Sequence, residues 1–199
     1  MDIFISTFLK MFFIMTPFFV LSVFLTLTQD ATPKEKKALA IKVTISVIIA
    51  SLILLFFGKH IFSVFGITLD AFRIGAGALL FLTAVELVKG SKDGAKASDK
   101  DISQLAVVPL AIPVTIGPGT IGILLVMGAT FESKSSLIMG SLALVSAVVV
   151  IGLMLYTSTV FERLIGKQGL LVISKITGLF LAALSAQIVF TGIKGFLEL

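Results

Sequence analysis

Six apolar stretches, each long enough to cross a bilayer, constrain this chain more than any other feature. The hydrocarbon core of a membrane takes about 20 apolar residues per helix. The stretches that meet this length, with ends defined to within a few residues, are Ile3–Thr28, Ala38–Gly58 (or to Phe65 in a tilted helix), Ala71–Val88, Ile102–Thr130, Leu137–Thr159 and Leu170–Leu197. The strand-like alternation of an outer-membrane barrel is not seen. We therefore predict an all-α integral membrane protein with six transmembrane helices.

The composition excludes several other classes of protein. Hydrophobic residues make up 57% of the chain and charged residues 14%, whereas a soluble domain carries roughly a quarter charged residues. Cys is absent and His60 is the single histidine, so we expect neither disulfides nor a metal site. The net charge of +5 could suggest nucleic acid, but the basic residues are scattered between apolar runs. We expect the lipid bilayer as a partner, and no nucleic acid and no cofactor.

The basic residues also predict how the chain is oriented, because cytoplasmic loops of membrane proteins are enriched in Lys and Arg. The connections after the first, third and fifth spans hold 11 of the 16 basic residues: Lys34, Lys36, Lys37, Lys42, Lys89, Lys92, Lys96, Lys100, Arg163, Lys167 and Lys175. Both termini are therefore expected to be non-cytoplasmic. Because no basic segment precedes the first apolar run, we expect that run to be a retained span and not a cleaved signal.

The two halves of the chain resemble each other. Arg73–Gly90 matches Lys175–Gly192 at a constant offset of 102, and earlier in each half Phe13–Pro17 (FIMTP) matches Pro109–Pro113 (PLAIP). The common order of these matches predicts a duplication, although each match alone is weak.

An odd number of spans in each half has a geometric consequence. Three helices followed by three equivalent helices cross the membrane in opposite senses, which gives an inverted repeat. We therefore predict a first three-helix repeat over 1–95 and a second over 96–199, joined near the linker Ser91–Asp101 within one membrane domain.

Breaks are expected in the first and fourth helices. Pro109–Thr120 (PLAIPVTIGPGT) contains three prolines and two glycines, which a regular helix cannot accommodate. Backbone groups freed in lipid must be buried against other helices or line a polar cavity. Thr16-Pro17 occupies the equivalent place in the first span, where a kink for packing is the simpler alternative. Paired interruptions in two halves are typical of a binding site near the midplane.

The interrupted segments predict the candidate binding residues. A half-helix that starts near Gly119 would direct unpaired N–H groups and a positive dipole end at a small carboxylate. Thr16, Thr115 and the carbonyls around Pro17 and Pro113 would hold an ammonium group or an ion. The expected substrate-binding residues are Thr16, Pro17, Pro113, Thr115, Gly117, Pro118, Gly119 and Thr120.

Three further features of the spans carry polar or charged side chains. Arg73 can pair with Asp70 one turn earlier, as an interfacial anchor. Gln187 and Thr191 share a helix face, which suits hydrogen bonding between helices or the lining of a pathway. Glu86 is an acid within an apolar run, so it is either an interfacial partner of Lys89 or a proton carrier.

The motif at Pro109–Thr120, together with FGIT at Phe65–Thr68, RIGAG at Arg73–Gly77 and KITGLFLAAL at Lys175–Leu184, resembles the MarC family of prokaryotic inner-membrane proteins. The resemblance covers essentially the whole chain. Members of the SnatA type are described as transporters of small neutral amino acids such as glycine and alanine, which is what the resemblance implies here. The family's first span often has Asn before the proline, where this chain has Thr16. If that Asn contacts substrate, affinity or selectivity differs here.

The leading hypothesis is a secondary transporter of small neutral amino acids that works by alternating access. The alternative is a passive channel, or an exporter of another small solute or drug. An enzyme is not expected, because neither a Ser–His pair nor paired carboxylates or metal ligands lie in the membrane spans. Coupling to protons or sodium, and assembly into a homo-oligomer, are left open.

Overall fold

The computed structural model describes residues 2–90, 105–131 and 133–197, and over these ranges the chain is helical. The elements run in the order α1 (Asp2–Ile14), α2 (Pro17–Leu27), α3 (Pro33–Phe65), α4 (Leu69–Lys89), the irregular segment η2 (Val107–Thr115), α5 (Pro118–Thr130), α6 (Lys134–Tyr156) and α7 (Ser158–Phe196). The expected linker Ser91–Asp101, the boundary between residues 95 and 96 and the start of the fourth span lie outside the described residues.

The elements account for the six predicted spans. Within the described ranges, four stretches are long and apolar enough to cross a membrane: Pro33–Gly58 of α3, α4, α6 and Gln168–Phe196 of α7. Two bent pairs, α1 with α2 at 41° and η2 with α5 at 67°, bring the number up to six if each pair is one span. The prediction of an all-helical membrane protein with breaks in its first and fourth helices is therefore confirmed.

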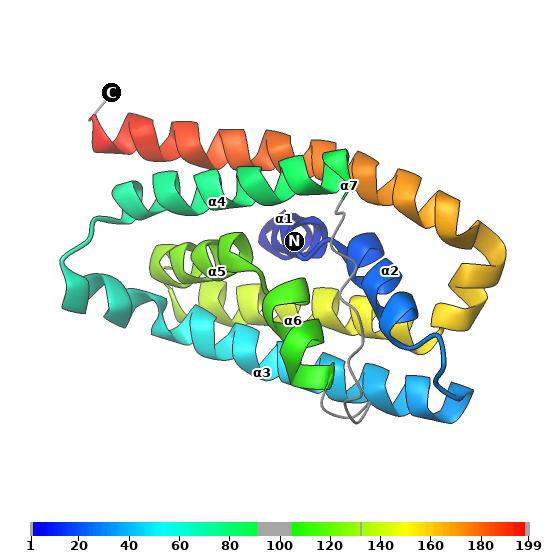
Figure 1. Ribbon diagram of the computed structural model, residues 1–199. Helices are drawn as coiled ribbons and strands as arrows, with labels where there is room; N and C mark the ends of the chain where they lie inside the picture. The colour runs from blue at the N-terminus through cyan, green and yellow to red at the C-terminus, as the bar shows by residue number, and fades with distance from the viewer. Residues whose placement is uncertain (1, 91–104, 132, 198–199) are drawn as a thin grey trace.

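The four long helices form the frame of the molecule. In Figure 1, α3, α4, α6 and α7 run across the view, with α4 packed on α7 and α3 packed on α6. The same view looks almost along α1, so this helix is steeply inclined to the frame. α1 packs on α6, and α5 packs on both α3 and α4. Both bent pairs therefore lie against the long helices.

Three helices that begin outside the breaks, α3, α4 and α6, have side-chain caps. Thr32 and Glu35 form a capping box at the start of α3, in which the Thr32 amide donates to Glu35 Oε2 at 2.8 Å. Ser133 and Ser136 form another at α6, and the Thr68 hydroxyl accepts a hydrogen bond from the Ala71 amide at α4. Such caps satisfy first-turn amides that have no partner within the helix.

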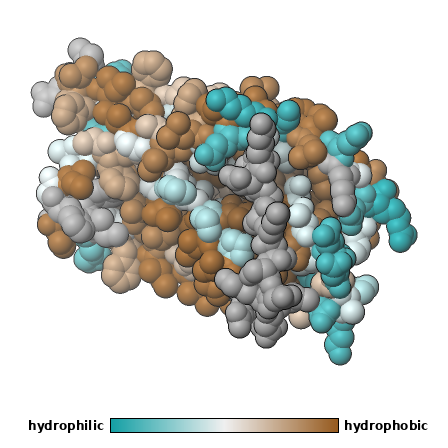
Figure 2. All heavy atoms as spheres, viewed as in Figure 1, coloured by the Kyte–Doolittle hydropathy of each residue, from teal (hydrophilic) through white to brown (hydrophobic). Residues whose placement is uncertain are grey.

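Apolar side chains cover the outside, as expected for a protein surrounded by lipid. α3 exposes an isoleucine at every fourth position, Ile41, Ile45, Ile49 and Ile53, each about half exposed. In Figure 2, apolar residues dominate the visible middle of the molecule, and hydrophilic residues gather toward the end where α2 ends and α3 begins. That end carries Lys34, Lys36 and Lys37, which the charge distribution predicts to be cytoplasmic.

Small residues let the helices approach closely. A Cβ atom at Gly77 of α4 would lie 2.7 Å from the Val189 side chain and 3.1 Å from the Ser185 carbonyl oxygen of α7. A Cβ atom at Gly128 of α5 would overlap the Leu55 carbonyl oxygen of α3. Close contact between small residues is the usual way in which membrane helices associate.

The two breaks suggest a register for the predicted repeat. α2 and α5, the second halves of the two bent pairs, each begin with a proline, Pro17 and Pro118, which are 101 residues apart. This spacing is close to the offset of 102 between Arg73 and Lys175, and it favours matching Pro17 with Pro118 over matching it with Pro113. The inverted repeat itself stays a prediction.

Candidate functional site

The first break is a single sharp turn at Thr16. This residue has φ 48° and ψ 59°, the left-handed conformation, and no other non-glycine residue in the described ranges has a positive φ. A β-branched residue in this region is strained by about 1–3 kcal/mol. The Thr16 side chain is 4% exposed, so the surrounding helices hold the turn in place.

The second break is longer and less regular. Val108 and Ile112 have extended backbone conformations inside η2, and the peptide bonds that precede Pro109 and Pro113 are cis. The Thr115 hydroxyl donates to the Leu110 carbonyl oxygen at 2.8 Å, and the Ile116 amide donates to the Ala111 carbonyl oxygen at 2.9 Å. The segment thus satisfies part of the backbone that its prolines leave unpaired.

α2 and α5 start at the breaks without side-chain caps. Neither Thr16 nor Gly117 makes a side-chain hydrogen bond to the first turn that follows it, and the first helical residue in each case is a proline, which has no N–H. The amides of the next two residues in each helix, Phe18 with Phe19 and Gly119 with Thr120, have no intrahelical acceptor. In this respect α2 and α5 resemble α7, whose N-cap Thr157 makes no side-chain cap either, and differ from α3, α4 and α6.

The candidate residues of the second break are tightly packed. Thr115 is 2% exposed and Thr120 is 4% exposed. A Cβ atom at Gly119 would lie 2.7 Å from the Leu80 Cα atom of α4, so this glycine is required for the contact between α5 and α4. Because α2 packs against η2, the helix that begins at Pro17 lies beside the segment that contains Pro113 and Thr115.

A cavity lined by both apolar and polar residues lies next to the breaks and not inside them. Its volume is about 230 Å³, and α1, α4, α5 and α7 enclose it. It is lined by Lys10, Met11, Ile14, Arg73, Ile123, Val126, Met127, Thr130, Leu184, Gln187, Ile188 and Thr191. None of the eight residues predicted to bind substrate lines it, but Ile14 precedes Thr16 by two residues and Ile123 follows Gly119 by about one helical turn.

The cavity has a polar end and an apolar end. Arg73 lies in the second turn of α4, Thr130 is the last residue of α5, and Thr191 lies near the end of α7. Ile14 is the last residue of α1 before the first break and Ile123 lies in the second turn of α5 after the second break, so the end nearer the breaks is apolar. The charge distribution predicts the polar end to be on the non-cytoplasmic side. The cavity is smaller than the roughly 300–1,000 Å³ typical of sites for drug-sized ligands, so it suits a small solute.

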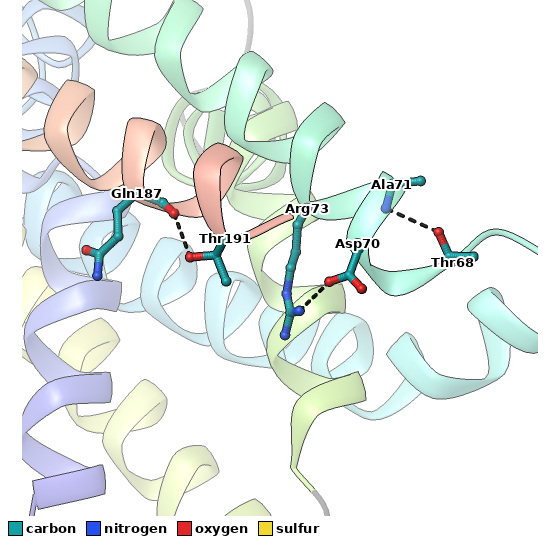
Figure 3. A network of polar contacts seen from close by, with 6 residues as sticks. All are labelled: Thr68, Asp70, Ala71, Arg73, Gln187 and Thr191. Atoms are coloured by element: carbon teal, nitrogen blue, oxygen red, sulfur yellow. Dashed lines mark hydrogen bonds and ion pairs between the residues drawn. The ribbon is translucent and has the colours of Figure 1, made fainter. Parts of the chain in front are cut away.

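The polar contacts around the cavity are shown in Figure 3. Arg73 Nη1 donates to Asp70 Oδ1 at 2.6 Å, as expected from their spacing, and the Thr191 hydroxyl donates to the Gln187 carbonyl oxygen at 2.7 Å. The Gln187 side chain extends away from Thr191. Thr191 thus bonds within its own helix, and both residues line the cavity.

Sequence reasoning had no means of assembling this cavity. The sequence gives no sign that Lys10 and Thr130 lie together, because they are far apart in the chain and neither lies in a recognisable motif. Glu86 is exposed and does not line the cavity, and its pairing with Lys89 is not found in the part of the chain that the structure describes. The described ranges contain no group of three or more His, Cys, Asp or Glu side chains that could hold a metal ion.

Comparisons with known proteins cover nearly the whole chain. Residues 1–197 match the family described as "MarC family integral membrane protein". A UPF0056 membrane protein of Aquifex aeolicus is 34% identical, with 98% of this chain and 94% of the relative aligned. The UPF0056 membrane protein YhcE of Escherichia coli is 30% identical, over 97% of this chain and 93% of the relative. Neither relative's name describes an enzyme.

A third relative, the UPF0056 membrane protein MJ1677 of Methanocaldococcus jannaschii, is 34% identical over 96% of both chains. No solved structure matches this chain. The agreement of the family match with full-length bacterial and archaeal relatives establishes the wider relationship. The chain belongs to the MarC family of integral membrane proteins.

Proposed function

We propose that the protein is a secondary transporter of small neutral amino acids of the glycine and alanine class. The observation that carries this proposal is the cavity of about 230 Å³, which combines Lys10, Arg73 and Gln187 with an apolar end beside two helix breaks. Cations and an amide side chain can bind a carboxylate and an ammonium group, and the small volume excludes large side chains. The resemblance to SnatA-type proteins supports this choice of substrate.

The breaks suggest how such a transporter would alternate. Discontinuous helices are common at transporter binding sites, where half-helix N-termini face anionic substrate groups. α2 and α5 begin next to the apolar end of the cavity, and their first-turn amides have neither a side-chain cap nor an intrahelical acceptor. In the proposed cycle, substrate enters the cavity, passes Ile14 and Ile123, and reaches the breaks as α2 and α5 reorient relative to the long helices.

The proposed setting is the cytoplasmic membrane of a prokaryote, with both termini on the non-cytoplasmic side. The cavity would then be the outward opening of the transporter. The direction of net transport and coupling to protons or sodium are not part of the proposal. A passive channel, or an exporter for another small solute or drug, would appear as a distinct outcome of the following experiment.

The test is uptake of radiolabelled glycine and alanine into proteoliposomes that contain the purified protein. It is run with and without unlabelled amino acid inside, and with and without pH and sodium gradients. We expect saturable uptake that unlabelled glycine or alanine competes away. Liposomes without protein give the background rate.

Two variants connect transport to the cavity. Gln187→Leu removes the amide that faces the cavity, whereas Phe190→Leu alters a residue that is 69% exposed on another side of the same helix. We expect the first variant to lose most of the uptake and the second to retain it. Flux that rises linearly with concentration would favour a channel, and absence of flux for glycine and alanine under every gradient would overturn the proposed substrate class.

A further inference from the structure

We infer that Arg73 is the residue that binds the substrate carboxylate in the outward opening of the cavity, with Asp70 as its positioning partner. This inference rests on the proposed function and assigns its first binding step to particular atoms. It moves carboxylate recognition away from the half-helix at Gly119, which is closely packed against Leu80.

The charges of the cavity favour an anionic group. Lys10 and Arg73 line it, and none of its lining residues is Asp or Glu. Asp70 compensates part of the Arg73 charge from outside the lining, which leaves the cavity itself cationic. A carboxylate would therefore find opposite charge there, whereas a simple amine would find none.

The guanidinium group of Arg73 has N–H donors that its hydrogen bond to Asp70 does not use. A guanidinium group carries five N–H donors in a planar fork that matches the two oxygens of a carboxylate. The hydrogen bond of 2.6 Å to Asp70 Oδ1 comes from Nη1, so other donors can face the cavity that Arg73 lines. Lys10, from α1, also lines the cavity and offers a point charge without such a fork.

The fold holds Asp70 in one place. Asp70 follows the helix cap at Thr68, and a Cβ atom at Gly195 of α7 would lie 2.7–2.8 Å from its carboxyl atoms. A Cβ atom at Gly192 would lie 2.8 Å from the Asp70 carbonyl oxygen and 3.0 Å from the Arg73 Cβ atom. The two glycines thus let α7 pack directly against the ion pair, and this packing fixes the position from which Arg73 reaches the cavity.

Gln187 completes the recognition of a neutral amino acid. It lines the cavity on the neighbouring helix, and its amide extends away from Thr191, as Figure 3 shows. The amide oxygen can accept a hydrogen bond from the substrate ammonium group while Arg73 holds the carboxylate. Without an acid in the lining, the ammonium group contributes less to binding than the carboxylate does.

The composition of the chain allows a direct binding test. The protein has two arginines, Arg73 in the cavity and Arg163 in the first part of α7, where it is exposed. The intact protein in proteoliposomes is treated with phenylglyoxal, a reagent that modifies guanidinium groups, and the modification of each arginine is measured by peptide mass spectrometry. Alanine, propionate and alaninol, which lacks the carboxylate, are added in turn, and Arg163 serves as the internal control.

We expect alanine to slow modification of Arg73, propionate to do so less, and alaninol to have no effect, with Arg163 unchanged throughout. In uptake assays, Arg73→Gln should raise the KM for alanine about tenfold or more, which is the scale of a lost hydrogen bond to a charged group. Arg73→Lys should recover part of the loss, and Arg163→Gln should behave like the wild type.

The outcomes separate this inference from the proposed function. Saturable alanine uptake by the wild type, with Arg73 unprotected and the KM of Arg73→Gln unchanged, would overturn the inference and leave the transporter in place. Protection of Arg73 by alanine in a protein that moves no amino acid would support the binding site and contradict transport. Equal protection by alanine and alaninol would overturn carboxylate recognition by Arg73.

Discussion

The backbone at Thr16 offers a physical reason for a side-chain preference in the first break. The first span of MarC-family proteins often has Asn before the proline, where this chain has Thr16. Thr16 adopts φ 48°, in the left-handed region. Asn enters the left-handed region more readily than other non-glycine residues, whereas a β-branched residue is strained there. An Asn at this position would therefore serve the turn itself, and a contact with substrate is not needed to explain it.

We expect Thr16→Asn to stabilise the protein, because it relieves part of this strain. The gain should be about 1 kcal/mol, which corresponds to a rise of about 2–4 °C in the midpoint of thermal unfolding for a chain of this size. Thr26→Asn is the matched control, since Thr26 is an exposed residue inside α2. A midpoint for Thr16→Asn that is no higher than that of Thr26→Asn would contradict the strain argument.

A substitution at Gly119 should destabilise the protein, because the contact of this glycine with α4 leaves no space for a methyl group. In Gly119→Ala the new Cβ would lie 2.7 Å from the Leu80 Cα atom, so α4 and α5 must move apart. Overpacking of this kind costs about 1–3 kcal/mol, and we expect a lower unfolding midpoint together with lost transport.

The control for Gly119→Ala is Gly75→Ala in α4, where a Cβ atom would meet nothing within 4 Å. This variant should unfold at or slightly above the wild-type midpoint, since Ala favours a helix over Gly. An unfolding midpoint for Gly119→Ala as high as that of Gly75→Ala would contradict the close contact between α4 and α5.

At the scale of elements, the spans were predictable and the cavity was not. Apolar length alone indicates α3, α4 and α6, and the cluster of prolines at Pro109–Thr120 predicts the second break. The cavity, by contrast, brings together Lys10, Arg73, Thr130 and Gln187 from four helices. Only the packing of these helices against one another places the four residues side by side. Periodicity within one helix places Gln187 and Thr191 on a common face, but it does not indicate what that face meets.

The two sides of α7 should differ in their access to water. The chain has no cysteine, so single-cysteine variants need no altered background. We expect Gln187→Cys and Thr191→Cys, which line the cavity, to react with a membrane-impermeant thiol reagent added from outside. Leu179→Cys and Phe190→Cys, on exposed apolar positions, should be shielded by lipid.

The reaction is measured as the fraction of protein labelled in sealed vesicles of known orientation, with and without alanine. Protection of Gln187→Cys by alanine is the expected result. Equal labelling of all four variants would mean that the cavity is not a distinct aqueous space.

At the scale of the whole molecule, the uneven distribution of charge predicts a single orientation. The ends of α3 and α6 that carry Lys36 and Lys134 should lie on opposite sides of the membrane, with Lys36 cytoplasmic. In intact cells we expect Lys134→Cys to react with an impermeant reagent and Lys36→Cys to react only after the cells are opened. Lys134 is exposed and Lys36 is partly exposed, and labelling of Lys36→Cys in opened cells shows that burial does not account for the difference. The reverse pattern would invert the assigned orientation and make the cavity an inward opening.

The central claim is that this MarC-family protein carries a small amino acid by alternating access, and counterflow tests it most directly. Proteoliposomes are loaded with unlabelled alanine at high concentration and diluted into a trace of radiolabelled alanine. A carrier that exposes its site to one side at a time accumulates the label inside transiently above its equilibrium level. Each unlabelled alanine that leaves the vesicle brings the binding site to the outer side, where it can bind labelled alanine. We expect this overshoot in the wild type and its loss in Arg73→Gln. Label that rises to equilibrium without an overshoot, at a rate independent of the alanine inside, would contradict alternating access.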